Sequence, residues 1–243
     1  MKTYILLSFF FLFCINCSAQ NINYETKSFL DSNKTKRYDV KVEYPQIIKY
    51  GDASAQDKIN KIIQSEILNI KDEFLKDIND FDLSSVPKEF SSSFESNYEM
   101  YYSGDNIFSF TYEIFQYAAG SAHPYYYSKA MNFNLNKIKQ IDFSDFFKNG
   151  EADLKFISEY CYADLKKQAK ENDYEFYDET LREGTEPTAG NFENICIKPE
   201  GLYVIFNPYQ VAAYAAGQQF VTIPYSKLTN IINPEGSLKI FIK

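Results

Sequence analysis

The stretch YAAGSAHPYYY, residues 117–127, contains the only histidine of the 243-residue chain, His123. Part of this stretch returns as YAAGQQF at residues 214–220. Small residues allow two backbones to approach closely, and glycine adopts backbone angles that other residues avoid. Pro124 restricts the residue before it to extended angles. We interpret the two stretches as a folding signature and expect the first to contact residues 209–217.

The candidate binding residues lie at these corners of the chain. They are His123, Ser121, Tyr125, Tyr209 and Tyr214. The residues expected to shape the backbone there are Gly120, Pro124 and Gly217. We interpret His123 as an imidazole that is hydrogen-bonded to a neighbouring loop and holds its corner. The alternative is an imidazole that contacts a ligand.

The sequence lacks the residues that most hydrolytic enzymes use. A serine triad would need His123 as its base, and Ser121 lies only two residues before it, without a nucleophile-elbow motif. Zinc hydrolases usually need two or three histidines, and no glycine-rich phosphate loop is present. The sequence therefore predicts no catalytic residue, metal or cofactor, and a protein that is not an enzyme. The alternative is a carboxylate pair among the 33 Asp and Glu residues, which spacing cannot locate.

The N-terminal residues indicate export. Lys2 precedes an apolar run, and Cys17-Ser18-Ala19 ends in small residues, which predicts a signal peptide over residues 1–19. Lipidation at Cys17 is the alternative. Either route places the protein in the periplasm or at the cell surface. Removal of Lys2 leaves 24 basic against 33 acidic residues, a charge of −9, which disfavours nucleic acid and favours a cationic partner.

Two cysteines, Cys161 and Cys196, remain after such processing. In an oxidising compartment they could pair as a disulfide. The alternative is two buried free thiols that pack as small hydrophobic residues.

The hydrophobic pattern predicts an α+β fold, with two main helices packed on an antiparallel sheet. Helical spacing of apolar residues predicts helices near 54–80 and 150–170. Alternating aromatic and β-branched residues predict a hairpin at 94–117, with its turn at 103–106. Residues 20–35 are expected to be frayed, residues 170–190 a long polar loop, and residues 237–243 a terminal strand.

Several motifs in chain order resemble the bacterial domain of unknown function 3298. The matching residues are Gly120, Ala122, His123, Pro124, Asn132–Leu135, Asp145, Phe146, Pro208, Tyr209, Tyr214, Ala215 and Gly217. The resemblance covers about residues 117–230. The upstream residues, with VKVEYPQI and INKIIQSEI, resemble the domain of unknown function 4163 that usually precedes it.

This resemblance implies a role outside the membrane. The paired segments occur in an anti-sigma factor that senses lysozyme, and in a part of a peptidoglycan deacetylase that precedes its metal-binding catalytic domain. We therefore predict a non-catalytic binding module of the cell envelope, whose ligand is lysozyme, another cationic protein or a peptidoglycan fragment. The alternative is a cell-wall glycan enzyme that uses a carboxylate pair. The expected divisions are 1–19, 20–116 and 117–243, the last two packed as one unit.

Overall fold

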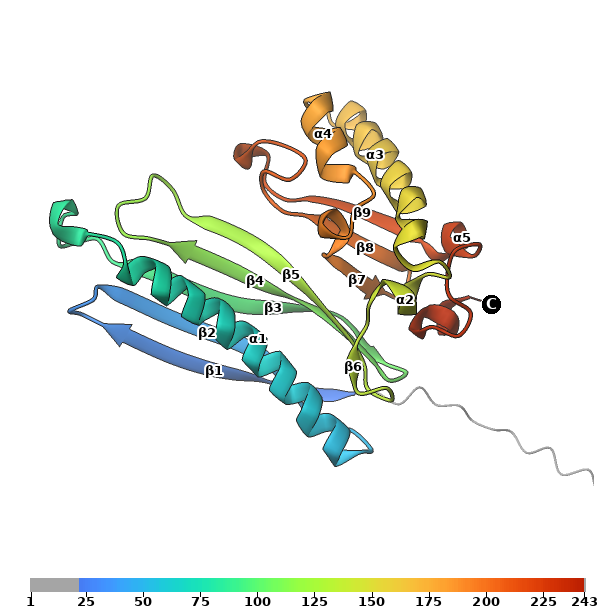
Figure 1. The fold of residues 1–243 in the computed structure, drawn as a ribbon, viewed down its shortest axis with the longest axis horizontal. Coiled ribbons are helices and arrows are strands. Elements are labelled where there is room, and N and C mark those ends of the chain that lie inside the picture. The colour runs from blue at the N-terminus through green and yellow to red at the C-terminus, as the bar shows by residue number, and fades with distance from the viewer. Residues whose placement is uncertain (1–21, 243) are drawn as a thin grey trace, which may run out of the picture.

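A computed structural model describes residues 22–242 and shows two sheets with helices on their outer faces (Figure 1). The predicted signal peptide and the lipidation site at Cys17 lie outside the described residues. Within residues 22–242, no helix is long and apolar enough to cross a membrane.

Six strands form the first sheet, in the order β1-β2-β3-β4-β5-β6. Their bounds are β1 Asn23–Asn33, β2 Tyr38–Lys49, β3 Ser92–Gly104, β4 Ile107–Tyr117, β5 Tyr125–Asn134 and β6 Lys139–Gln140. The pair β2 and β3 is parallel, because helix α1 (Ala53–Asn79) connects them across the sheet. All other neighbours in this sheet are antiparallel.

Helix α1 covers one face of this sheet (Figure 1). Asp52 caps its first turn by accepting hydrogen bonds from the backbone N–H groups of Ser54 and Ala55. One stripe of the helix is buried against the sheet, and it consists of Ala55, Ile59, Ile63, Ile67, Ile70, Phe74 and Ile78. The helix that the apolar spacing predicts is therefore confirmed.

The predicted hairpin is formed by β3 and β4. Its turn residues Asp105 and Asn106 have φ angles of 49° and 65°. Two residues with positive φ between antiparallel strands match the twist of the strands, and Asp and Asn tolerate this conformation. The local sequence thus determines where this hairpin turns.

The second half of the chain builds a three-stranded antiparallel sheet, β7-β8-β9. The elements of this half are α2 Phe143–Phe146, α3 Leu154–Glu171, α4 Asp178–Thr185, β7 Ile195–Lys198, β8 Gly201–Phe206, β9 Gln219–Pro224 and α5 Tyr225–Leu228. Its short 3-10 turns are Gly150–Asp153, Gly190–Phe192, Tyr214–Ala216 and Ser237–Phe241, and one more, Leu83–Ser85, lies in the first half between α1 and β3. Helix α3 packs on one face of this sheet, and the other face turns toward the first sheet (Figure 1). The α+β class is confirmed.

Asparagine side chains join the two halves. The outer edge of β5 lacks a strand partner along Tyr125–Asn132, so its backbone groups need other partners. Asn207 accepts from the backbone N–H of Ser128 and donates to its carbonyl, both at 2.9 Å. Asn194 accepts from the N–H of Ala130 at 2.9 Å. The second half of the chain therefore covers the exposed edge of the first sheet.

Three expectations about local structure were wrong. Residues 23–33 form the edge strand β1 instead of a frayed segment, since a polar strand suits a solvent-exposed edge. The expected 170–190 loop contains α4, whose buried Leu181 packs in the second core. Residues 237–241 form a 3-10 turn instead of a strand, and Leu238 of this turn is buried in the second core. The division into 20–116 and 117–243 stays a prediction.

Candidate functional site

The two Ala-Ala-Gly stretches meet in space and form a cluster of aromatic rings, which we call the aromatic corner: His123, Tyr126, Tyr209 and Tyr214. The rings of His123 and Tyr214 stack with centroids 4.4 Å apart. The ring of Tyr214 also contacts Tyr209 at 5.4 Å and Tyr126 at 5.9 Å. The expected contact between the two stretches is therefore present.

Polar contacts hold the aromatic corner together. The Tyr214 hydroxyl donates to the Pro124 carbonyl over 2.6 Å. The His123 Nδ1 atom lies 2.8 Å from the same carbonyl, and its Nε2 atom lies 3.5 Å from the Tyr209 hydroxyl. His123 therefore does contact a neighbouring loop, as expected, but its side chain is exposed to solvent.

Three residues at the corner have left-handed backbone angles. Gly120 has φ = 93° and Gly217 has φ = 70°, which suits glycine. Tyr209 has φ = 71°. A bulky residue in this conformation costs about 1–2 kcal/mol, so the surrounding contacts must hold Tyr209 in place.

The other predicted site residues do not join the ring cluster. Tyr125 stacks on Tyr127 at 5.4 Å, on the α1 side of the sheet, because neighbouring residues of a strand face opposite ways. Ser121 is exposed in the turn, and its side chain makes no hydrogen bond to any residue of the described part of the chain.

A carboxylate that sequence reasoning missed lies beside the aromatic corner. Glu113 of β4 is half-buried on the sheet face that turns away from α1. It accepts a hydrogen bond from the Thr111 hydroxyl at 2.5 Å and from the Ser128 hydroxyl at 2.7 Å. Burial raises the pKa of the Glu113 carboxyl above its ordinary value, and the nearby charge of Glu99 raises it further, against the two hydrogen bonds.

Glu113 also links the two sheets through a polar chain. Ser128, which donates to Glu113, accepts a hydrogen bond at 2.6 Å from the Gln218 side-chain amide. The same amide donates to the Asn207 side chain at 3.0 Å. The position of the Glu113 carboxyl is thus fixed by residues from both halves of the chain.

A hollow of about 170 Å³ opens next to Glu113. Its walls include Glu95, Asn97, Glu113 and Tyr126. Asn97 lies directly opposite Glu113 in the β3–β4 register, and Glu95 is two residues away on the same face. Diagonal neighbours of this kind have Cα atoms about 7–8 Å apart. Tyr126 belongs to both the hollow and the aromatic corner, so the two form one continuous surface.

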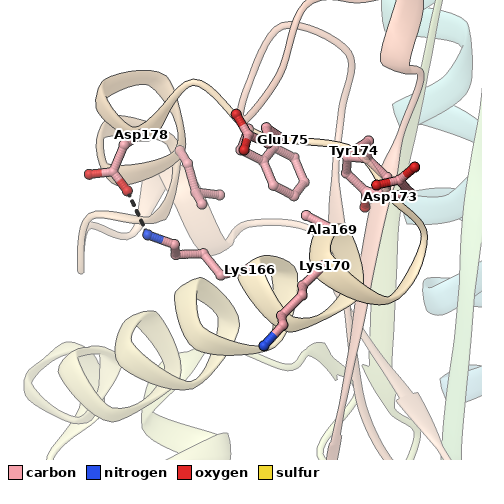
Figure 2. A pocket seen from close by; sticks show the side chains of 9 residues that line it. Lys166, Ala169, Lys170, Asp173, Tyr174, Glu175 and Asp178 are labelled. Atoms are coloured by element: carbon pink, nitrogen blue, oxygen red, sulfur yellow. Dashed lines mark hydrogen bonds and ion pairs between the residues drawn. The ribbon is translucent and has the colours of Figure 1, made fainter.

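A larger hollow of about 800 Å³ lies between α3 and the segment that leads to α4 (Figure 2). Two of its charged groups are paired: the Lys166 ammonium lies 3.1 Å from the Asp178 carboxylate, as Figure 2 shows. Hydrogen bonds from Tyr162, Arg182 and Lys166 hold the pKa of Asp178 well below its ordinary range. This carboxylate is therefore already satisfied, and we place the candidate site at Glu113 instead.

Cys161 and Cys196 are both buried and are free thiols in the structure. Burial raises the pKa of each thiol. Cys161 belongs to the core under α3, and Cys196 lies between the two sheets. Of the two alternatives, the structure has the buried free thiols and not the disulfide.

No group of three or more His, Cys, Asp or Glu side chains in residues 22–242 is placed to hold a metal ion.

The comparisons with known proteins match each half of the chain. Residues 144–226 match the sequence model of DUF3298, a protein family of unknown function. The chain carries a DUF3298 domain. Residues 31–126 match the family described as Deacetylase PdaC. The predicted resemblance to domain 3298 is thus confirmed over residues 144–226, but Gly120–Pro124 lie within the other match and Asn132–Leu135 within neither. The identity of the upstream half as domain 4163 stays a prediction.

One curated relative is the peptidoglycan-N-acetylmuramic acid deacetylase PdaC of Bacillus subtilis (strain 168). It is 25% identical over 221 residues, which cover 91% of this chain and 44% of the deacetylase. The chain therefore spans less than half the length of this relative.

Two crystal structures of DUF3298 proteins share the fold. One, from Bacteroides fragilis NCTC 9343, has a TM-score of 0.63 and 18% identity, and the match covers 91% of this chain and 98% of the other. The second, from Pseudomonas aeruginosa PAO1, has a TM-score of 0.61 and 12% identity, and the match covers 88% of this chain and 96% of the other. At these identities the likeness concerns the fold alone.

The prediction that the protein is not an enzyme is contradicted by these comparisons. The family matched by residues 31–126 and the curated relative both carry the name of a deacetylase. The prediction relied on the shortage of histidines for a triad or a zinc site and on the resemblance to a segment that precedes a separate catalytic domain. That shortage has no bearing on carboxylate chemistry, and only the fold brings Glu95 and Glu113 to one hollow.

Proposed function

We propose that the protein acts outside the cytoplasm as a hydrolase of bacterial cell-wall glycan, with the hollow between Glu113 and Glu95 as its catalytic site. The matches to a peptidoglycan deacetylase support the substrate class and the location. The raised pKa of Glu113 beside a second carboxylate is the observation that carries the proposal.

The two carboxyl groups suit different roles. A carboxyl whose pKa is raised by burial keeps its proton to a higher pH and can serve as a general acid. Glu95 is exposed, lines the same hollow and can accept a proton. A separation of about 6.5–9.5 Å between two carboxyl groups leaves room for an attacking water in glycan hydrolysis, and Glu95 and Glu113 line the same hollow.

The proposed step is a hydrolysis. Glu95 takes a proton from a water molecule as the water oxygen attacks the electrophilic carbon of the substrate. Glu113 gives its proton to the departing oxygen or nitrogen as the bond to the carbon breaks. The name of the matched relative makes the N-acetyl group of the glycan the first bond to test, with acetate and an amine as products. The glycosidic bond is the second.

The test incubates the protein with purified peptidoglycan and measures released acetate and new reducing ends. We expect the wild type to release one of these products and both Glu113→Gln and Glu95→Gln to lower the rate about 100-fold or more, the usual contribution of a general acid or base. Glu159→Gln is the control, because Glu159 is an exposed carboxylate on α3. A wild type that releases neither product, or a fully active Glu113→Gln variant, would refute the proposal.

A further inference from the structure

The aromatic corner exposes one tyrosine far more than its neighbours. Tyr209 is 56% exposed, although its ring packs on Tyr214 and its hydroxyl faces His123. One ring face is thus supported by other aromatic residues while the side chain remains open to solvent. Tyr177 is 72% exposed but belongs to no ring cluster among the described residues, so exposure alone does not distinguish Tyr209.

The backbone at Tyr209 is held in an unfavourable conformation. Its φ of 71° is rare for a bulky side chain, and glycine would adopt it without strain. A strained residue persists where the surrounding structure fixes it, and such residues gather at binding and catalytic sites. At this position the strain presents an aromatic ring to solvent.

The chemistry of the corner favours a neutral, hydroxyl-rich ring as ligand. The C–H face of a sugar ring is apolar and packs on aromatic rings, and its hydroxyl groups need nearby donors and acceptors. The corner supplies the rings of Tyr209 and Tyr214 with the His123 nitrogen and the Tyr209 hydroxyl beside them. Among residues 22–242, no lysine, arginine or carboxylate contributes a ring contact or hydrogen bond to these three side chains.

The corner is also in the right place to extend the hollow. Tyr214 contacts Tyr126, and Tyr126 lines the hollow that contains Glu113. A linear glycan that occupies the hollow would therefore meet Tyr126 first and then Tyr214, which contacts Tyr209.

We propose that the aromatic corner is a saccharide-stacking subsite, in which the ring of Tyr209 packs against a sugar residue adjacent to the one at Glu113. This inference rests on the proposed function, because the identity of the ligand follows from the glycan substrate. Tyr209 would bind and position the chain, and Glu113 would perform the chemistry.

The test is titration calorimetry with a soluble tetramer of N-acetylglucosamine. We expect Tyr209→Ala to weaken binding about tenfold or more, which corresponds to about 1.4 kcal/mol. Tyr177→Ala, the control, should bind within about twofold of the wild type. A wild type that does not bind the tetramer, or a Tyr209→Ala variant that binds it equally well, would overturn the subsite.

A second comparison separates this inference from the proposed function. Glu113→Gln should bind the tetramer like the wild type but release product from peptidoglycan at least about 100-fold more slowly. If binding depends on Tyr209 while the wild type releases no product, only the hydrolytic proposal fails. If the wild type hydrolyses peptidoglycan while Tyr209→Ala leaves tetramer binding unchanged, only the subsite fails. Circular dichroism of each variant confirms that it is folded.

Discussion

The contact between the two sheets depends on a small buried polar network, and Asn132→Ala tests it. Asn132 is only 5% exposed. Its amide donates to the Ile195 carbonyl at 2.6 Å, and its carbonyl accepts from the Ser109 hydroxyl at 2.7 Å. Ser109 in turn accepts from the Ile197 backbone N–H at 2.9 Å. These bonds join β4 and β5 of the first sheet to β7 of the second.

Asn132→Ala removes both side-chain bonds at once. Each buried hydrogen bond contributes about 1 kcal/mol, and each buried polar group left without a partner costs about 1–3 kcal/mol. The Ile195 carbonyl loses this donor, and the Ser109 hydroxyl loses its acceptor. The unfolding free energy should therefore fall by about 2–4 kcal/mol, a large share of the total of about 5–15 kcal/mol typical of folded proteins.

The assay is urea denaturation, monitored by two independent probes. The urea midpoints of the variant and the wild type are compared, provided that the dependence of the unfolding free energy on urea has the same slope in both. Asn149→Ala is the matched control: Asn149 is exposed and bonds only to nearby Asp153, so the change should stay within about 0.5 kcal/mol. A double-mutant cycle with Ser109→Ala should show coupling of about 1 kcal/mol. If Asn132→Ala matches the control, or the two changes are additive, the network does not hold the sheets together.

Three further predictions concern the corner, the carboxyl group and the partner. Gly217→Ala should lower the unfolding free energy by about 1–2 kcal/mol, because φ is 70° at this residue. Gly190→Ala is the control and should leave the unfolding free energy unchanged, because an added Cβ meets open space there. Equal melting temperatures of the two variants would contradict this prediction. Burial raises the pKa of Glu113 in the folded state, so the wild type loses stability as the pH rises from the unfolded to the folded pKa. The stability of Glu113→Gln relative to the wild type should thus increase with pH. A difference in urea midpoint between the two proteins that does not change with pH would contradict this prediction. The acidic chain, formally −8, should bind basic lysozyme in calorimetry at low and at physiological salt. A heat of binding at low salt alone would indicate nonspecific charge pairing. No heat of binding at either salt concentration would exclude lysozyme as a partner.

The sequence alone determined the elements whose signals are local. The apolar spacing of residues 59–78 produces the buried stripe of α1, since every third or fourth side chain of a helix shares one face. The Asp105-Asn106 turn determines the hairpin, because both residues tolerate positive φ. The repeated Ala-Ala-Gly stretches indicated their own contact through small residues and glycine. The sequence also identified the DUF3298 domain through motifs in chain order.

The tertiary structure decided what depends on partners distant in the chain. Residues 23–33 become a strand because they pair with β2, whereas residues 237–241 form a 3-10 turn whose Leu238 packs into the second core. The candidate site follows the same reasoning. One of 33 acidic residues, Glu113 acquires a raised pKa through burial and a neighbour, Glu99, that strand register brings close. The hydrogen bond from Ser128 and the nearby Glu95 likewise come from strand pairing, whereas the bond from Thr111 is local to β4. No spacing in the sequence encodes that pairing, because a strand's partners are selected by the whole fold.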